Sequence, residues 1–504
     1  MKSVEGIGWF PVILVIVLFA YLDSLTYGFL SMDDPEYVYE NPHVQTGLSV
    51  ENVKWSFSSA TGGGSYWHPL TWLSHQLDCS LFGLNAGRHH ATNLIFHLLA
   101  VMAIAGLGQA LGLTAFQRAV VICTFALHPV QVESVVWIAE RKNLLSGGCI
   151  LLALSSFLYY LRRSDKGALI LCFCSGVLGM MAKPSAVVIP VALLILWVWF
   201  RRFESKDHDI KLDRNSLFLL AGLFLCSTLV AFVTVWAQRE VGALVGLGEL
   251  GLAGRLDRLW FSYVWGMWHF IYPVDLSIAY SYGGEFIGRV GFCGGLGVIL
   301  LSYLAWRHSD KRGLVFLGWF LYLLVMLPSS GIVQVGMQSF ADRYLYLGVM
   351  ALSLVVVGLG SAFKGISFSF FSRAAILAFL VGVMVWQTRI NTGKWRDSVT
   401  LFRSAADRDP DNWFVVLGLG AALLNVGEDE SALHYVLKAR ELNANSDLSS
   451  YLLALCYVSR DDSVKALEAL EEIDGESLSR YQELSEQLKF QIAAEAGPST
   501  QSGL

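Results

Sequence analysis

Two adjacent carboxylates, Asp33 and Asp34, lie in GFLSMDDPEYVYENPH, directly after the first apolar run of the chain. A carboxylate within hydrogen-bond reach of a hydroxyl can act as a general base. The alternative is structural, because Asp34 before Pro35, with Glu36 in the first turn, is the pattern of a helix N-cap. The N-cap pattern does not explain Asp33, which lies at the end of the apolar run. An ionisable group in that position costs free energy unless it has a partner or a function.

A second group of reactive side chains lies in LHPVQVESVVWIAERKNLLSG (127–147), a short turn between two apolar runs. The turn contains His128, Glu133, Glu140, Arg141 and Lys142. Arginine can hold a phosphate or pyrophosphate with a bidentate fork, and lysine can hold it as a point charge. Alternatively, Glu140 pairs with one of the cations, and the cations reach lipid headgroups.

Further cations flank apolar runs in MMAKPSA and QSFADRYLYLG, which supply Lys183 and the pair Asp342 and Arg343. Each lies within a residue or two of the apolar run. Anionic headgroups would attract such cations, and so would a substrate that carries a lipid phosphate. We therefore group Lys183 and Arg343 with Arg141 and Lys142 as candidate phosphate ligands.

Histidines and cysteines do not form a metal-binding pattern. His68 lies in the first polar loop, and His90 and His97 are seven residues apart, which places them on one helix face. No carboxylate or cysteine joins them at ligand spacing, so we expect no metal site. Most of the eight cysteines lie in or beside apolar runs and are predicted to be small core residues.

The composition indicates an integral membrane protein. The chain has 504 residues, of which 55% are hydrophobic and 15% charged, and its mean hydropathy is +0.52. The net charge is −5 and no basic block is present, which argues against a nucleic-acid partner. The first apolar run has no small-residue cleavage site, so we expect a retained signal anchor.

Eleven apolar runs approach or reach the length that crosses a bilayer. They lie at about 8–30, 90–112, 113–130, 143–161, 167–182, 186–200, 215–236, 289–306, 313–328, 344–361 and 374–390. A twelfth candidate, 256–282, is rich in aromatic residues but is interrupted by charges and Pro273. We interpret it as an interfacial segment on the external face.

The distribution of basic residues decides between eleven and twelve spans. With eleven spans and the N-terminus inside, the basic loops at 162–166, 201–214, 307–312 and 364–373 all lie on the cytoplasmic side, where Lys and Arg collect. The external side then carries the first loop (31–89), the turns around 128–142 and Lys183, the loop 237–288, the turn 329–343 and the C-terminal region. All the candidate site residues named above lie on this external side.

The composition after residue 390 is that of a soluble helical domain with a repeat. LLNVGEDESAL and CYVSRDDSVKAL are offset by 34 residues, as are DPDN and NANS. This period predicts a tetratricopeptide array over 391–495, and generic paired helices are the alternative. Such arrays bind peptides or proteins. The tail 496–504 is predicted to be disordered.

Five segments and their order resemble a known family. They are MDDPEYVYENPHVQTGLSVENVKWSFS (32–58), YWHPLTWLSHQLDCSLFGLNAGRHHATNLIFHLL (66–99), LHPVQVESVVWIAERKNLLS (127–146), MAKPSAVVIPVALLI (181–195) and FADRYLYLG (340–348). Followed by the repeat, they resemble bacterial relatives of the transmembrane and tetratricopeptide repeat-containing O-mannosyltransferases, of the glycosyltransferase C superfamily. The resemblance covers nearly the whole chain.

We therefore predict an all-α fold with about 11 transmembrane helices over 1–390, plus the C-terminal repeat domain. The resemblance implies a multi-span fold of the glycosyltransferase C type, which agrees with the count obtained from the basic loops. It also implies a polyprenyl-phosphate-linked sugar as donor and transfer on the non-cytoplasmic face, in a bacterial inner membrane. Asp33 and Asp34 match the acidic pair of the family, and Glu140, Arg141 and Lys142 match its basic segment. Asn143 stands where an acidic residue commonly follows, which leaves its role open.

A mechanism follows as a hypothesis. Asp33 would take the proton of the acceptor hydroxyl, and Asp34 would cap the next helix or orient the acceptor. The cations would neutralise the charge that develops on the departing phosphate. One displacement with one base predicts inversion at the anomeric carbon. Alternatively, the acidic pair holds a divalent cation that bridges the donor phosphate.

Rival classes are a transporter or flippase and a membrane scaffold that recruits partners through its repeats. A transporter predicts internal symmetry and charges at mid-span, neither of which the sequence has. A scaffold does not need the acidic pair. The sequence leaves open the sugar, with mannose as one candidate, the carrier, and the acceptor, which is a protein Ser or Thr, a lipid or a growing glycan.

Overall fold

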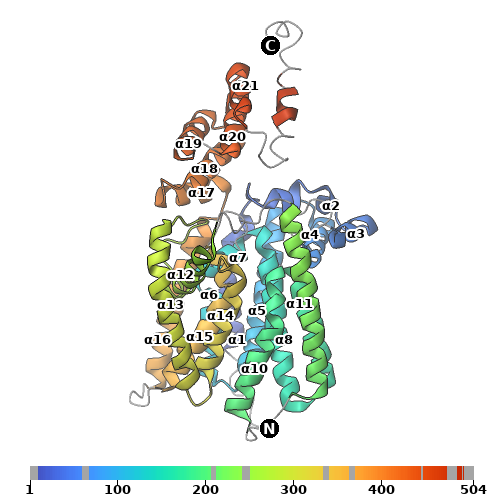
Figure 1. The fold of residues 1–504 in the computed structure, drawn as a ribbon, viewed down its shortest axis with the longest axis vertical. Coiled ribbons are helices and arrows are strands. Elements are labelled where there is room, and N and C mark those ends of the chain that lie inside the picture. The colour runs from blue at the N-terminus through green and yellow to red at the C-terminus, as the bar shows by residue number, and fades with distance from the viewer. Residues whose placement is uncertain are drawn as a thin grey trace. The chain divides into compact units, whose positions relative to one another are not determined.

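A computed structural model describes residues 9–58, 67–205, 212–240, 250–332, 340–362, 369–443, 446–473, 485–490 and 492. These residues form helices and loops, with no β-strand among them (Figure 1). The chain divides into two compact units, the first made of 1–276 and 282–396 and the second of 277–281 and 397–504. The all-helical prediction is thus confirmed for the described part of the chain.

The first unit is a helical bundle. Its α-helices are α1 (Phe10–Tyr21), α2 (Pro42–Gln45), α3 (Val50–Ser58), α4 (Pro69–Phe82), α5 (Ala86–Ala110), α6 (Ala115–Leu127), α7 (Val132–Val136), α8 (Arg141–Arg163), α9 (Lys166–Ala182), α10 (Ile189–Trp199), α11 (Arg214–Glu240), α12 (Leu252–Ile271), α13 (Gly284–Arg307), α14 (Leu314–Met326), α15 (Tyr346–Ala362) and α16 (Phe370–Gly393). Short 3-10 or π turns at Pro35–Tyr39 (η2), Ile138–Glu140 (η5), Pro184–Val188 (η6) and Asp342–Leu345 (η9) adjoin the candidate site.

Seven helices in the described residues are long and apolar enough to cross a membrane. An eighth is added if Ala115–Leu127 and Pro129–Val136, which meet at a bend of 47°, count as one span. Phe10–Thr26, Lys166–Ala182 and Leu314–Ser329 are apolar but shorter. The chain is therefore an integral membrane protein by length and composition of its helices, and the count of eleven spans stays a prediction.

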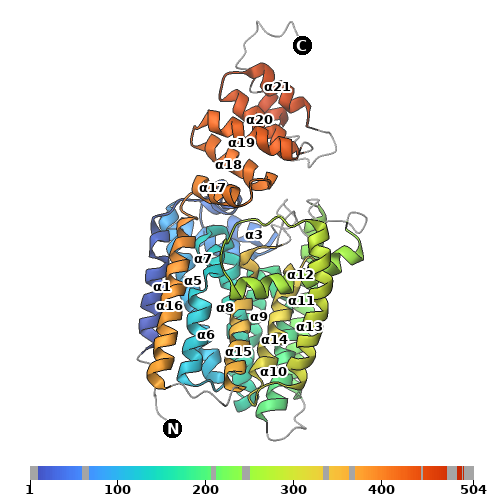
Figure 2. The same ribbon diagram turned by 90° about the vertical axis from the view of Figure 1, so that its left-hand side faces the viewer.

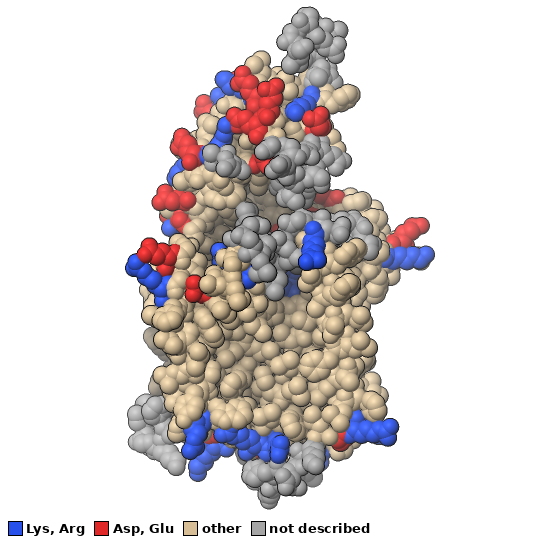
Figure 3. Space-filling model, viewed as in Figure 1, with Lys and Arg blue, Asp and Glu red and all other residues tan. Residues whose placement is uncertain are grey.

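The loops with predicted cytoplasmic charge meet at one end of the bundle. Arg162, at the end of α8, pairs with Glu204 beyond α10 at 2.5 Å. Arg312, before α14, donates to Gln117 at the start of α6, and Gln117 donates to Ser361 at the end of α15. In Figure 3, Lys and Arg gather at this lower end, below a belt of the first unit that shows few charges.

Helix α12 begins and ends on the opposite side. Near its start Arg255 donates to the Ile332 carbonyl, which follows α14, and near its end the Phe270 carbonyl contacts His128, which follows α6. Figure 2 shows α12 lying across the other helices instead of alongside them. This placement agrees with the prediction that 256–282 is an interfacial segment.

The first polar loop folds into a layer of short helices. Asn41 caps α2 by accepting a hydrogen bond from the His43 amide, and prolines begin both α2 and α4. Thr71 in α4 donates to the Ala182 carbonyl at the end of α9 (2.8 Å). The loop is thus attached to the end of the bundle that carries Lys183.

The second unit contains α17 (Ser398–Arg408), α18 (Trp413–Asn425), α19 (Asp429–Leu442), α20 (Asp447–Val458) and α21 (Ser463–Glu471). The starts of α18 and α20 are 34 residues apart, and so are those of α19 and α21. A Cβ on Gly420 would lie 2.7 Å from Val436, so α18 and α19 pack closely there. The predicted tail 496–504 lies outside the described residues.

Candidate active site

Asp34 is fully buried and does not cap the helical turn that follows it. Its Oδ2 accepts a hydrogen bond from the Leu30 amide (2.8 Å), and its Oδ1 accepts one from the Ala139 amide (3.0 Å). The predicted N-cap role is wrong because both oxygens are engaged elsewhere and the turn at Pro35 has no side-chain cap. The carboxylate instead attaches the first loop to the turn before Glu140. Burial raises its pKa to about 7, against the effect of the two backbone hydrogen bonds.

Asp33 has the opposite surroundings. Its side chain is 43% exposed, and its Oδ2 lies 3.6 Å from Lys142 Nζ. Its backbone carbonyl accepts a hydrogen bond from the Tyr37 amide (2.9 Å). Asp33 is therefore the member of the acidic pair that a substrate can reach.

Glu133, Glu140, Lys142, Lys183 and Arg343 come together, and we call them the charge cluster. Glu140 is central, because its Oε1 lies 3.2 Å from Lys142 Nζ and 3.5 Å from Arg343 Nε, and its Oε2 lies 3.5 Å from Lys183 Nζ. Glu133, Glu140 and Lys142 come from the consecutive elements α7, η5 and α8, whereas Lys183 precedes η6 and Arg343 lies in η9, far along the sequence. The predicted association of the 127–147 turn with Lys183 and Arg343 is thus present in the fold.

Arg343 is fixed by Glu133 and by aromatic rings. Its guanidinium and its backbone amide both donate to the Glu133 carboxylate. The guanidinium carbon lies 5.4 Å from the Trp137 ring centre and 5.1 Å from the Tyr344 ring centre. Glu133 therefore orients the arginine, and the arginine still reaches Glu140.

The two lysines of the cluster have different environments. Lys142 Nζ donates to the Tyr37 hydroxyl (3.2 Å) and lies beside Asp33. Lys183 Nζ donates to Asn143 Oδ1 (2.5 Å). Burial, together with the charges of Lys142 and Arg343, lowers the pKa of Lys183 to about 8, although Glu140 opposes the shift.

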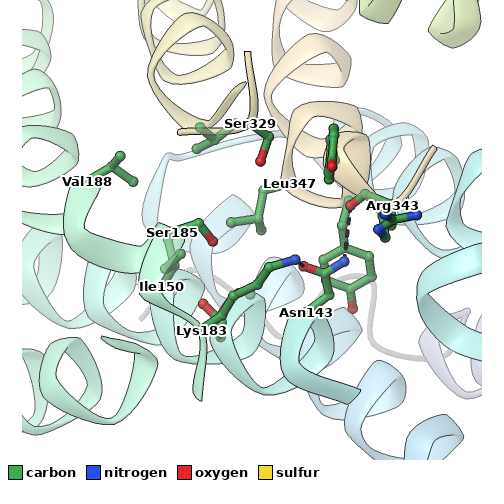
Figure 4. Close-up of a pocket in the computed structure, with 13 residues that line it drawn as sticks. Asn143, Ile150, Lys183, Ser185, Val188, Ser329, Arg343 and Leu347 are labelled. Carbon is green, nitrogen blue, oxygen red and sulfur yellow. Dashed lines mark hydrogen bonds between the residues drawn. The ribbon is translucent and has the colours of Figure 1, made fainter. Parts of the chain in front are cut away.

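A pocket opens beside Lys183 and Arg343, between α8, η6, α14, η9 and α15 (Figure 4). The pocket is partly open to solvent, and its cavity volume is about 40 Å³. Its polar lining includes Asn143, Lys183, Ser185, Ser329 and Arg343, and its apolar lining includes Ile150, Val188, Val325 and Leu347. A ligand with an anionic head and an apolar tail matches both parts of this lining.

Arg141 is placed differently from its predicted role. Its buried guanidinium pairs with Asp78 at 2.6 Å and donates to Asn93 (2.7 Å) and to the carbonyls of Ser74 and His89. These partners belong to α4 and α5, away from the charge cluster. The structure therefore corrects the assignment of Arg141 as a phosphate ligand, because its hydrogen-bonding groups hold helices together.

The remaining candidates surround the site without entering the cluster. His128 bonds to the Phe270 carbonyl (3.0 Å) and stacks on the Phe270 ring, which is a structural role. His68 is buried against Tyr37 and Trp72, and burial lowers its pKa well below the usual range. Asp342 is buried at the start of η9, next to Arg343.

One contributing residue was missed in the sequence. Tyr37 bonds to Lys142, and its place four residues after Asp33 on a helical turn was the available signal. The role of Asn143, which the sequence left open, is now described by its contacts with Glu140 and Lys183. Within the described segments, no three His, Cys, Asp or Glu side chains come close enough to hold a metal ion.

The fold and the site define an integral membrane protein with a charged site at one end of an apolar bundle. No protein-family model matches the sequence. Mouse protein O-mannosyl-transferase TMTC4 is 24% identical, over 81% of this chain and 63% of the mouse protein. Human TMTC3 is 24% identical over 87% of this chain and 51% of its own length, and human TMTC1 is 28% identical over 81% and 52%.

The chain is a distant relative of these protein O-mannosyl-transferases. It spans about half to two thirds of the length of the relatives it matches. The family resemblance predicted from the motifs is confirmed at this level.

Proposed function

We propose that this protein is a membrane glycosyltransferase that moves a sugar from a polyprenyl-phosphate donor to an acceptor hydroxyl. The observation that carries the proposal is the exposed carboxylate of Asp33 beside Lys142, which connects through Glu140 to Lys183 and Arg343. The names of the relatives support mannose as the sugar and a protein Ser or Thr as the acceptor.

The reaction is one displacement. The acceptor oxygen attacks the anomeric carbon, the bond from that carbon to the phosphate oxygen breaks, and the hydroxyl proton passes to Asp33. Because the acceptor attacks from the face opposite the leaving phosphate, the anomeric configuration inverts. Lys142, Lys183 and Arg343 stabilise the charge on the departing phosphate.

The three cations of the charge cluster could still bind the donor phosphate, although Glu133 and Glu140 pair with them. Their side chains are 11%, 18% and 12% exposed for Lys142, Lys183 and Arg343, and each has several N–H donors. The two buried glutamates hold the cations in place before the donor arrives, so less rotamer entropy is lost on binding. The pocket beside Lys183 and Arg343 would receive the phosphate and the first part of the lipid.

The topology that accompanies this proposal has eleven spans. The basic loops meet at one end of the bundle, and the site lies at the other, so positive-inside bias puts the site on the external side of a plasma membrane, the bacterial inner membrane in the family we expect. The helices after residue 396, with their 34-residue period, would form a tetratricopeptide domain that binds the acceptor protein or another partner.

The experiment that tests the function is an in vitro transfer assay with the purified protein, a polyprenyl-phosphate sugar and an acceptor. We expect Asp33→Asn to lower turnover by about 100-fold or more, because it removes the general base. Glu51→Gln, at an exposed position of α3, is the matched control and should turn over like the wild type. Unchanged transfer by Asp33→Asn would refute the assignment of Asp33 as the general base. If the protein is instead a scaffold, the wild type itself should transfer no sugar.

Two further measurements examine the donor side of the proposal. Lys142→Met should raise the KM for the donor more than that for the acceptor, because Lys142 contacts the phosphate. Equal effects on both would contradict the clamp. Transfer should persist in EDTA, because the cations replace a divalent ion, and loss of activity with recovery on adding Mg²⁺ would favour the alternative in which the acidic pair binds a metal.

A further inference from the structure

Asn143 lies at the centre of the site and is not one of the ionisable groups that the mechanism uses. Its Nδ2 donates to Glu140 Oε2 (2.7 Å), to the Arg343 carbonyl (3.1 Å) and to Ser134 Oγ (3.2 Å). Its Oδ1 accepts from Lys183 Nζ (2.5 Å). Figure 4 shows its side chain between Lys183 and the backbone of Arg343.

The Nδ2 group has two hydrogens for its three acceptors, so at least one hydrogen is shared between two of them. A carboxamide still fits these contacts, because it combines an accepting oxygen with N–H donors and can hold an ammonium and a carboxylate at the same time. A carboxylate at this position could accept from Lys183 but could not donate to Glu140, and the two acids would repel. An alanine would lose all four contacts.

We propose that Asn143 is the positioning residue that holds Lys183 toward the pocket and fixes the distance between Glu140 and the backbone of η9, which carries Arg343. Lys183, Asn143 and Arg343 all line the pocket. With the amide in place, Lys183 and Arg343 would both stay beside the pocket, where one bound anionic group could reach them. The consequence for transfer rests on the proposed function, whereas the contact with Lys183 does not.

The first measurement does not depend on any activity. Competitive labelling of the purified protein with acetic anhydride across pH, read by mass spectrometry, gives the pKa of Lys183. The groups that face Lys183 are Glu140 from η5, Lys142 and Asn143 from α8, Arg343 from η9 and the buried His68 before α4. Asn143→Asp places a new negative charge against the ammonium, so we expect the titration of Lys183 to move upward by about one pH unit or more.

The second measurement is the affinity for a polyprenyl monophosphate that carries no sugar, detected by native mass spectrometry. The KM for the donor in the transfer assay is measured alongside it. Asn143→Ala should weaken lipid-phosphate binding, and raise donor KM, by about tenfold, since it removes a hydrogen bond to a charged group. The KM for the acceptor should stay unchanged. Asn425→Asp, at an exposed position of the second unit, is the control for the added charge, and Asn425→Ala is the control for the truncation.

The outcomes separate this inference from the proposed function. Two results together support the positioning role, even if the wild type transfers no sugar. They are an upward shift of the Lys183 pKa in Asn143→Asp and weaker lipid-phosphate binding in Asn143→Ala. A Lys183 titration that does not move in Asn143→Asp overturns it, even if the wild type is an active transferase. An equal rise in the KM for acceptor and donor, in a variant with a lowered melting temperature, would also overturn the positioning role, because this result would indicate that Asn143 has a general structural role.

Discussion

Asp33 and Asp34 are neighbours in the chain, but their carboxylates do different things. Asp33 is exposed and close to a lysine, whereas Asp34 is buried and accepts backbone hydrogen bonds from Leu30, in its own segment, and from Ala139, 105 residues further along the chain. A buried carboxylate that holds two loops together positions its neighbours, and an exposed one can exchange a proton with a substrate. The pair therefore separates into a base and a positioning residue in our proposal.

The buried carboxyl of Asp34 predicts a pH effect on stability. Its pKa is raised from 3.8 to about 7, so between these pH values the folded chain holds a proton that the unfolded chain has lost. This contribution to stability is fully present below about pH 4 and is lost as the pH rises through about 7. We expect the melting temperature of the wild type, measured relative to Asp34→Asn in detergent, to fall from pH 4 to pH 7. A constant difference would contradict the raised pKa.

Arg141 shows how a residue next to the site can act as a connection between helices. Arg141→Gln removes the cation paired with the buried Asp78, which then keeps only the Thr92 hydroxyl and the nearby His89 ring, and loss of one member of a buried ion pair typically costs about 3–5 kcal/mol of stability. We expect a strong fall in melting temperature, and partial recovery in the double variant Arg141→Gln/Asp78→Asn. A variant that stays fully stable but has a raised donor KM would instead restore Arg141 to the phosphate site.

At the scale of elements, helix packing decides where Arg343 lies. Helix α12 approaches α14 and η9 closely at Gly266, where a Cβ would lie 2.5 Å from the Tyr322 hydroxyl and 3.0 Å from Leu345. That hydroxyl is itself bonded to the Tyr263 carbonyl at 2.6 Å and cannot easily retreat. Leu345 belongs to the same short turn as Arg343, so a side chain added at Gly266 would displace this turn and with it Arg343.

Gly266→Val is therefore expected to displace η9, to lower the melting temperature by several degrees, and to raise donor KM more than acceptor KM. Gly297→Val on α13 is the matched control, because nothing lies within 4 Å of a Cβ there. Both substitutions place the same side chain in a helix, so the difference between them isolates the packing. If Gly297→Val had the same effect, helix propensity would be the cause.

At the scale of the whole molecule, the two ends of the first unit carry different kinds of charge. One end has basic loops at helix ends, and the other has the charge cluster, the first loop and α12. The predicted orientation puts the first loop outside the cell and the loop after α8 inside it.

Cysteine labelling in intact cells measures this orientation. With exposed Cys174 and Cys293 replaced by serine, a membrane-impermeant maleimide should label Glu51→Cys in intact cells if α3 is external, as we predict. Lys166→Cys, at the start of α9, should react only after permeabilisation. Labelling of both positions from the same side would contradict an odd number of spans between them, and with it the placement of the site.

Much of the fold follows from the sequence because its signals are local. Apolar runs marked the helices, and the basic loops indicated which helix ends meet. The interfacial placement of 256–282, which rests on the distribution of basic loops, stays a prediction. The 34-residue spacing of helix starts was visible as a repeat. The span count of eleven stays a prediction, since the short helices are too short to count by length alone.

Composition, periodicity and motif order can be read from the sequence directly, so they suffice to predict a helical membrane protein and the residue types of its site. Which charged side chains contact one another depends on how the helices pack, and this was visible in the tertiary structure alone. Arg141 and Lys142 are adjacent, yet consecutive side chains of a helix point in directions about 100° apart, so Arg141 meets Asp78 and Lys142 meets Asp33 and Glu140. In the same way, burial separated Asp34 from Asp33, because no local pattern specifies the amide of Ala139 as its partner.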